Sequence, residues 1–158
     1  MPITVTVRTD ADPATTWQRI SDIPNWPDWN PACAAVITDD ATIGPGTRLR
    51  MQMRHPRGRL FWTEPEITAL NAPEELSWMI RAMGVRAPLT IRCDELTDGG
   101  TAVTLTTRSS GFMAFAYRLV FPEKTQGLLW SGTLTALGQS LRPAEPAPTR
   151  SESSRRPR

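Results

Sequence analysis

A stretch of ten residues near the N-terminus, Asp22–Pro31, limits the folds that this chain can adopt. It contains three prolines and two tryptophans, Trp26 and Trp29, and it has no regular apolar period. Each proline fixes its own φ angle, lacks a backbone donor and keeps the preceding residue out of the α region. A long helix or a central strand is therefore excluded here, while the large apolar area of the indoles favours their burial. We expect a tight helical connector whose tryptophans pack into the core beside a C-terminal helix.

The chain has 158 residues, which suits one domain with a substantial core. Residues 143–158 hold four arginines and two glutamates among prolines and serines, so the net charge of +2 belongs to this segment and the remainder is neutral. We expect a domain at residues 1–142 and a disordered tail at 143–158. A neutral domain lacks the basic surface that nucleic-acid binding requires, and no nucleic-acid partner is expected.

Hydropathy and cysteine content indicate a cytoplasmic protein. No apolar run approaches the roughly 20 residues needed to span a bilayer, and the N-terminus lacks the features of a signal peptide. Two cysteines, Cys33 and Cys93, do not form a disulfide framework. The single histidine, His55, argues against a structural zinc site, and no phosphate-binding loop or dinucleotide fingerprint occurs. We expect neither a metal nor a cofactor.

The hydrophobic pattern predicts strands followed by one long helix. Residues 3–8 alternate as a strand, and Asp12 with Pro13 forms the capping pattern of a helix over Pro13–Ser21. A helical stripe then begins near Phe121 and ends near Arg142. Between connector and stripe, alternation and turn residues predict further strands at 34–38, 47–54, 60–70 (interrupted or bulged at Pro65), 76–81, 89–93 and 103–105.

This order is an α+β plan, in which a curved antiparallel sheet of about seven strands wraps the C-terminal helix and leaves a core or cavity between them. Its motifs resemble those of the START-related helix-grip superfamily, and of its polyketide cyclase/dehydrase branch in particular. The resemblance covers roughly residues 2–142 and rests on six features in order: Asp12-Pro13 with Trp17, the Asp22–Pro31 connector, Gly44-x-Gly46-Thr47, Ile67 and Pro73 before Leu76-x-Trp78, Gly100-Thr101-x-Val103, and the terminal helix.

The resemblance implies an internal cavity that binds a hydrophobic small molecule. Methionines on the predicted strands agree with this, because methionine fills irregular apolar space adaptably. Ordinary core packing is the alternative for each of them. The candidate substrate-binding residues are Trp29, Met51, Met53, Trp62, Trp78, Met79, Met83, Tyr117 and Trp130.

Four polar residues are candidates for catalysis, each with a structural alternative. Glu64 and Glu66 would act as acid or base if they entered the cavity, and the alternative places them in solvent with Thr63 and Ile67 inside. Arg81 would stabilise an enolate oxygen if it pointed inward, or it is a surface residue. Histidine is the side-chain type suited to acid–base chemistry near neutral pH, but His55 lies in a predicted turn, where an exposed histidine is the alternative.

Two functions follow. The first is cofactor-free cyclisation, or cyclisation with dehydration, of a polyketide-type intermediate in secondary metabolism, in which the cavity folds a flexible chain. The second is a carrier or sensor of a hydrophobic metabolite or lipid. Charged side chains without protein partners inside the pocket would favour the enzyme, and an apolar pocket would favour the carrier. A monomer or homodimer that does not act at a membrane is expected in either case.

Overall fold

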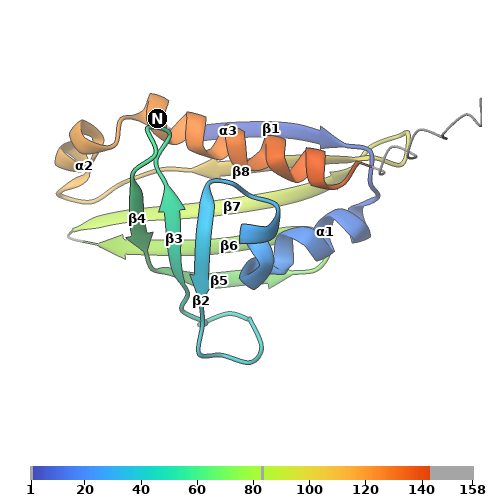
Figure 1. Cartoon of the computed structure of the whole chain (residues 1–158), viewed down its shortest axis with the longest axis horizontal. Coiled ribbons are helices and arrows are strands. Elements are labelled where there is room, and N and C mark those ends of the chain that lie inside the picture. The colour runs from blue at the N-terminus through green and yellow to red at the C-terminus, as the bar shows by residue number, and fades with distance from the viewer. Residues whose placement is uncertain (1, 83, 143–158) are drawn as a thin grey trace, which may run out of the picture.

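The computed structural model describes residues 2–82 and 84–142. Met83 and the predicted tail at 143–158 lie outside the described residues. The elements follow the chain in the order shown in Figure 1: β1 (Ile3–Thr9), α1 (Pro13–Ser21), the 3-10 helix η1 (Ile23–Asp28), β2 (Cys33–Ile37), β3 (Arg50–Arg54), β4 (Leu60–Thr63), β5 (Pro65–Asn71), β6 (Glu75–Ala82), β7 (Val85–Glu95), β8 (Thr101–Thr107), α2 (Ala114–Val120) and α3 (Glu123–Ser140).

The strands form two antiparallel sheets. The larger has the order β1-β8-β7-β6-β5, and the smaller has the order β2-β3-β4. The small sheet crosses the strand direction of the large one (Figure 1). Backbone hydrogen bonds from Leu49 N to Pro65 O (2.9 Å) and from Ile67 N to Thr47 O (2.9 Å) join the two at β5. The α+β helix-grip prediction is confirmed, with eight described strands in two sheets instead of about seven in one.

Local signals explain the N-terminal elements. The carboxylate of Asp12 accepts a hydrogen bond from Thr15 N at 2.7 Å, and Pro13 occupies the first turn, so α1 has the predicted limits. Hydrogen bonding from the side chain of Thr15, and then from its backbone N–H, lowers the pKa of the exposed Asp12 carboxyl. Register also follows the alternation, because β1 pairs with β8 from Ile3 opposite Thr107 to Thr9 opposite Thr101.

The connector forms η1 and enters the core through Trp26. Its side chain is fully buried, its indole N–H donates to Ile20 O at 2.9 Å, and its ring lies 5.6 Å from that of Trp78 on β6. Trp29 is half-buried and packs 5.5 Å from Trp26. The indole of Trp78 then reaches Trp130 on α3 at 6.3 Å. Trp26 therefore contacts the C-terminal helix indirectly, through the sheet.

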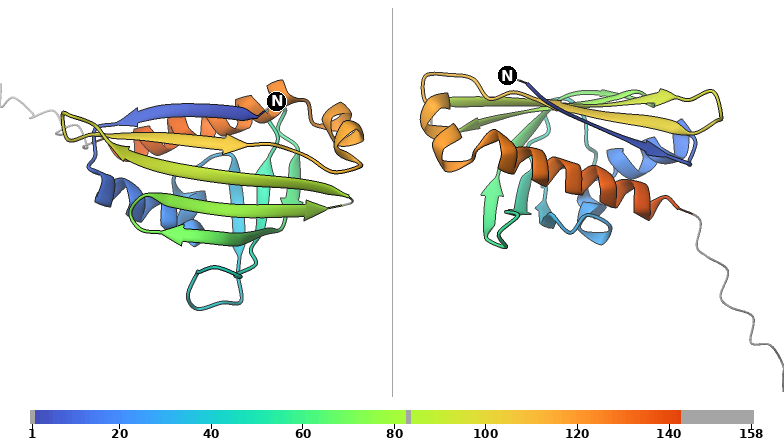
Figure 2. Two further views of the ribbon diagram at one scale, coloured as in Figure 1. Left: turned by 180° about the vertical axis from the view of Figure 1, so that it is seen from behind. Right: turned by 90° about the horizontal axis from the view of Figure 1, so that it is seen from above.

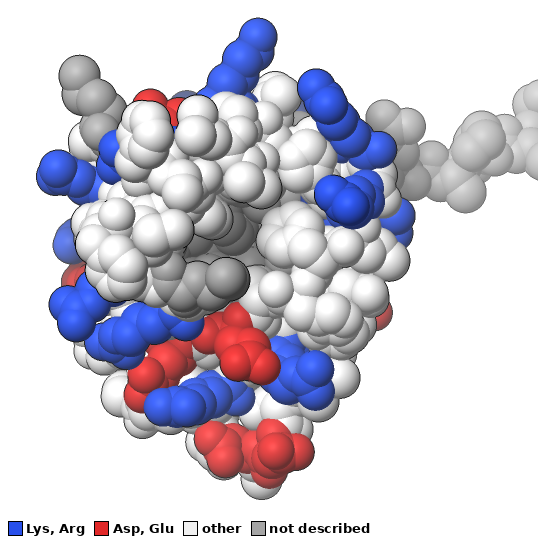
Figure 3. All heavy atoms as spheres, turned by 90° about the vertical axis from the view of Figure 1, so that its left-hand side faces the viewer, with Lys and Arg blue, Asp and Glu red and all other residues white. Residues whose placement is uncertain are grey.

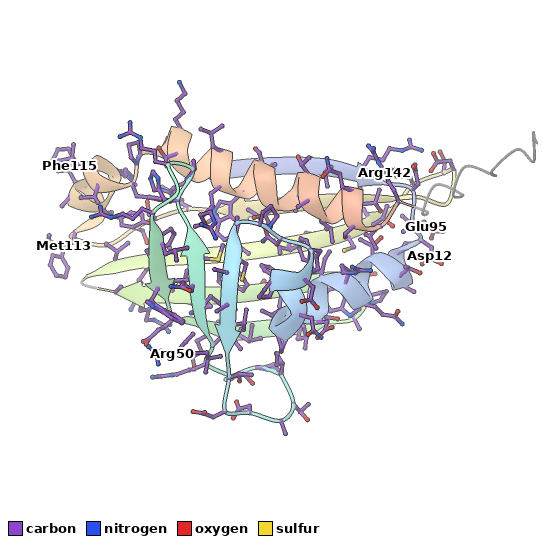
Figure 4. All side chains as sticks on the ribbon, in the orientation of Figure 1. Asp12, Arg50, Glu95, Met113, Phe115 and Arg142 are labelled. Atoms are coloured by element: carbon purple, nitrogen blue, oxygen red, sulfur yellow. The ribbon has the colours of Figure 1, made fainter. Side chains whose placement is uncertain are left out.

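Two regions differ from the prediction. The extended segment at 60–70 is divided at Glu64, and its halves belong to different sheets. The second difference is α2, which the hydrophobic pattern does not indicate because its large apolar side chains face outward. Phe115 is 74% exposed and Leu119 70% exposed, and Phe115 points away from the body of the molecule (Figure 4).

Helix α3 lies along one face of the large sheet, with the small sheet beyond it (Figure 2). Its buried side comprises Leu129, Trp130, Leu134, Ala136 and Leu137, with the polar Gln126 and Thr133 among them. Helix, large sheet and small sheet therefore share one interior. The candidate site lies at the end of that interior next to α2.

Candidate functional site

A pocket of about 200 Å³ opens between α2, the start of α3 and the inner faces of the sheets. It is lined by residues of β3, β4, β6, β7, β8, α2 and α3 and by Phe121 between the last two. Figure 3 views this end of the molecule and shows a hollow bordered by uncharged side chains. Every side chain of residues 2–82 and 84–142 that lines the pocket is uncharged.

Period-two alternation decides which residues reach the pocket. Met51 and Met53 are buried and line it, whereas Arg50 and Arg54, which flank them on the strand, are exposed. The outward direction of Arg50 is visible in Figure 4. On β6, Trp78, Ile80 and Ala82 line the pocket in the same way. One strand phase thus supplies the wall on β3, β6 and β7, whereas β4 contributes the consecutive residues Phe61, Trp62 and Thr63.

Six of the nine proposed substrate-binding residues line the pocket: Met51, Met53, Trp62, Trp78, Tyr117 and Trp130. Trp62 lies at the rim, 47% exposed, with the guanidinium of Arg50 at 5.1 Å from its ring. Trp29 does not line the pocket because it packs on Trp26 at the other side of the core. Met79 has the opposite phase to Trp78 and also lies outside the lining. Met83 lies outside the described residues.

The four proposed catalytic residues do not line the pocket. Glu64 forms an ion pair with Arg50 at 3.6 Å, and Glu66 forms one with Arg81 at 3.3 Å, all at the surface. The reason is the phase of β5, in which Pro65 and Ile67 are buried and the glutamates point away. This is the alternative arrangement, with Thr63 and Ile67 inside. Each carboxylate already has a cationic partner and is solvated, so neither is poised for proton transfer in the pocket.

His55 is in the β3–β4 turn, where its ring packs edge-on against Phe121 with 5.4 Å between ring centres. It lines a second, outer hollow instead of the pocket. Its Nδ1 accepts a hydrogen bond from Arg57 N at 3.1 Å. The histidine is therefore half-buried and held in place at the surface, close to the end of the pocket.

Several uncharged polar groups lie in the pocket wall. The Trp78 side chain is 1% exposed, and its indole N–H has no acceptor among the residues that the structure describes. Gln126 donates through Nε2 to Phe121 O at 2.9 Å, which leaves its Oε1 as an acceptor. Burial raises the pKa of the Tyr117 hydroxyl, which keeps it protonated at neutral pH. A ligand could therefore meet two donors and one acceptor in an otherwise apolar space.

Sequence reasoning missed Gln126, Thr63 and Thr107 as lining residues. Gln126 carried a detectable signal, because it precedes Trp130 by four positions and so shares the buried face of α3. Thr107 ends β8 on its inward phase and donates to Pro88 O at 2.7 Å. Thr63 was named only in the alternative arrangement, in which Glu64 and Glu66 face solvent and Thr63 faces the interior. A polar residue within an apolar helix or strand pattern is therefore the sequence signal for a polar group in the pocket wall.

The described residues offer no metal centre and no membrane-spanning helix. Among residues 2–82 and 84–142, no three His, Cys, Asp or Glu side chains gather as metal ligands would. No helix in this described part is both long and apolar enough to cross a bilayer. Cys33 and Cys93 are free and buried, and burial raises the pKa of each thiol to about 11.

Solved structures of other proteins share this architecture. Protein Ms6760 from Mycobacterium smegmatis is 19% identical, with 91% of this chain and 92% of that chain covered at a TM-score of 0.70. A START superfamily protein from the same organism is 16% identical, with 89% and 96% covered at a TM-score of 0.71. The di-domain ARO/CYC protein BexL, from the BE-7585A biosynthetic pathway, is 17% identical at a TM-score of 0.69, with 90% of this chain and 51% of that chain covered. At these identities the likeness shows the fold.

A search of curated proteins finds no match to the chain. Residues 2–139, however, match the family described as "Polyketide cyclase / dehydrase and lipid transport". The match includes every described strand and nearly all of α3, and therefore the whole frame of the pocket. The protein is a ligand-binding helix-grip protein that belongs to the polyketide cyclase/dehydrase and lipid transport family.

Proposed function

We propose that the protein binds a hydrophobic small molecule in the pocket beneath α3 and carries or senses it without changing it chemically. The observation that supports this proposal is the uncharged lining of the pocket. An acid or base that transfers protons must lie within hydrogen-bond reach of the substrate. The carboxylates and guanidinium proposed for that role, Glu64, Glu66 and Arg81, form ion pairs at the surface instead.

The shape of the site suits a slender ligand. Its volume of about 200 Å³ is below the roughly 300–1,000 Å³ common for ligand pockets. Met51 and Met53 form part of the wall, and their flexible side chains can adjust to an occupant. The Trp78 N–H is the natural hydrogen-bond donor to a ligand oxygen, since a buried donor without an acceptor costs free energy.

Filling the pocket tests the proposal. Ala87 lines the pocket on β7, and Ala87→Phe should occupy its space. The neutral fluorophore N-phenylnaphthylamine should bind the unaltered protein with increased emission and should lose at least about tenfold in affinity in the variant. Ala102→Phe, on β8 and outside the lining, is the matched control and should bind normally. Equal binding by both variants would place the fluorophore elsewhere and contradict the proposal.

Ring closure is the second candidate function, and the Tyr117 hydroxyl favours it. This hydroxyl stays protonated, lines the pocket and could donate to a developing enolate oxygen. The resemblance in fold to an ARO/CYC protein points the same way. Incubation with a linear poly-β-keto thioester, followed by chromatography, separates the candidates. We expect the rate of ring formation to equal that of the buffer control. Faster cyclisation that Tyr117→Phe abolishes would establish the enzyme.

A further inference from the structure

A second hollow of about 440 Å³ lies outside the pocket, at the β3–β4 turn. Phe61, Tyr117 and Phe121 line both spaces. Their rings form one cluster, with centres 5.8 Å apart for Phe61 and Phe121 and 6.0 Å apart for Tyr117 and Phe121. Because the same side chains face both sides, the partition between the pocket and the outer hollow is one layer of aromatic rings. Rotation of these side chains would join the two.

The outer hollow differs from the pocket in charge. His55, Arg57 and Arg59 line it, together with Phe61, Tyr117, Val120 and Phe121, and no Asp or Glu among the described residues does. Neither Arg57 nor Arg59 forms an ion pair with any residue that the structure describes. This contrasts with Arg50 and Arg81, which are paired with glutamates on the strands. Within the part of the chain that the structure describes, the guanidinium groups of Arg57 and Arg59 therefore carry positive charge without an ion-pair partner beside the pocket.

The turn holds these residues in a defined arrangement. Gly58 N donates to His55 O and His55 N donates to Arg59 O, each at 2.7 Å. Gly58 has a φ of +95°, which a side chain would strain, so the two arginines flank a glycine that the turn requires. Because His55 Nδ1 accepts from Arg57 N, the neutral imidazole carries its proton on Nε2 and can donate there. The hollow thus offers three side chains that can donate hydrogen bonds, those of His55, Arg57 and Arg59.

The two spaces together select an amphiphile. The pocket alone accommodates an apolar group but no ionised group, because burying an unpaired charge in an apolar space is strongly unfavourable. Arginine, in contrast, binds a carboxylate through paired charge-assisted hydrogen bonds. An anion at the outer hollow would stay partly solvated while its apolar chain passed the aromatic rings.

We propose that the ligand is a single-chain anionic amphiphile, with its apolar chain in the pocket and its anionic group held by Arg57 and Arg59. This inference rests on the proposed function, since it specifies the class of molecule that the pocket binds. It also assigns a role to the β3–β4 turn, in which Arg57 and Arg59 distinguish an acid from an alcohol of the same chain length.

Three probes with one chain length test the inference: decanoate, decanol and decylammonium. Each is titrated below its micellar concentration, and tryptophan emission reports binding because Trp78 and Trp130 line the pocket. We expect decanoate to bind at least about tenfold more tightly than decanol, and decylammonium to bind more weakly than either. Added salt should weaken the binding of decanoate and leave that of decanol unchanged.

The double variant Arg57→Gln/Arg59→Gln should bind both decanoate and decanol with the affinity of the unaltered protein for decanol. Normal decanol binding also shows that the variant is folded. Arg48→Gln/Arg92→Gln removes the same charge at exposed positions outside both hollows and should keep the preference for the acid.

The outcomes separate the two proposals. If decanoate and decanol bind the unaltered protein equally, or if the Arg57/Arg59 variant still prefers decanoate, the proposal of an anionic ligand is refuted. The proposal that the pocket binds a hydrophobic molecule is then unaffected. If no probe binds and N-phenylnaphthylamine is also rejected, the proposed function fails and this inference fails with it.

Discussion

The side-chain amide of Asn30 donates a hydrogen bond of 3.3 Å to the hydroxyl oxygen of Thr133, 103 positions further along the chain. Both residues are buried. The Asn30 Oδ1 accepts from Ala32 N at 3.0 Å, and the Thr133 hydroxyl donates to Leu129 O at 3.1 Å within α3. A polar contact in the core thus attaches the end of the proline-tryptophan connector to the C-terminal helix.

Removing the hydroxyl should destabilise the protein. Thr133→Val keeps the volume of the side chain but leaves the Asn30 N–H buried without an acceptor, which costs about 1–3 kcal/mol in free energy of unfolding. Urea denaturation of the variant and the unaltered protein measures this change in unfolding free energy. Thr6→Val removes a similar but exposed contact, to Thr104 at 3.4 Å, and should change stability by no more than about 0.5 kcal/mol. Equal effects of the two substitutions would contradict the role of the Asn30 contact.

The two connector tryptophans should differ in their contribution to stability. Trp26→Ala removes a fully buried ring and its hydrogen bond to Ile20 O, and should cost about 3–5 kcal/mol. Trp29→Ala should cost clearly less, because Trp29 is only half-buried. Chemical denaturation of both variants gives the comparison. A larger loss for Trp29 would mean that Trp26 is not the main anchor.

Alanine substitutions at two glycines distinguish the effect of helix propensity on stability from that of backbone strain. A Cβ added at Gly132 or at Gly99 would meet no atom within 4 Å, but only Gly99 has a positive φ, of +87°. Gly132→Ala in α3 should stabilise the protein by about 0.5–1 kcal/mol. Gly99→Ala should destabilise it by about 1–2 kcal/mol. Thermal melts of the pair measure both effects, and a shared sign would refute the reasoning.

The buried thiols predict a loss of stability in alkali. The folded-state pKa of Cys33 and of Cys93 is about 11, against 9.0 for the ordinary thiol, because burial disfavours the thiolate. Between these values the unfolded chain has lost its thiol protons and the folded chain keeps them. Stability should therefore fall as pH rises from about 9 to 11, by at most about 1.4 kcal/mol per pH unit for each thiol.

The measurement is urea denaturation across that pH range. Cys93→Ala should show a smaller slope of unfolding free energy against pH than the unaltered protein. A thiol reagent at pH 8 should also react slowly with the native protein and rapidly in urea. Fast reaction of the native protein would show that the thiols are accessible.

Much of the fold could be predicted because its signals are local. The Asp12 cap and Pro13 set the start of α1, and alternation along 47–54 and 76–81 set the strand phases. The helical stripe through Trp130 predicted α3, which spans Glu123–Ser140 where the pattern suggested 121 to 142. Helix α2 carries no such stripe, because its apolar side chains are exposed and have no period that marks a buried face.

The sequence by itself determined which residues share a face of each strand, but not which face looks inward. Glu64, Glu66 and Arg81 alternate regularly with apolar neighbours, and a period of two permits either direction. Only the tertiary structure decided it, because Pro65 and Ile67 are buried while Glu66 pairs with Arg81 outside. The polar turn at His55 likewise became a candidate anion site only when folding placed it beside Phe121. An apolar pocket and its charged mouth are assembled from segments far apart in the chain, and no local pattern encodes that meeting.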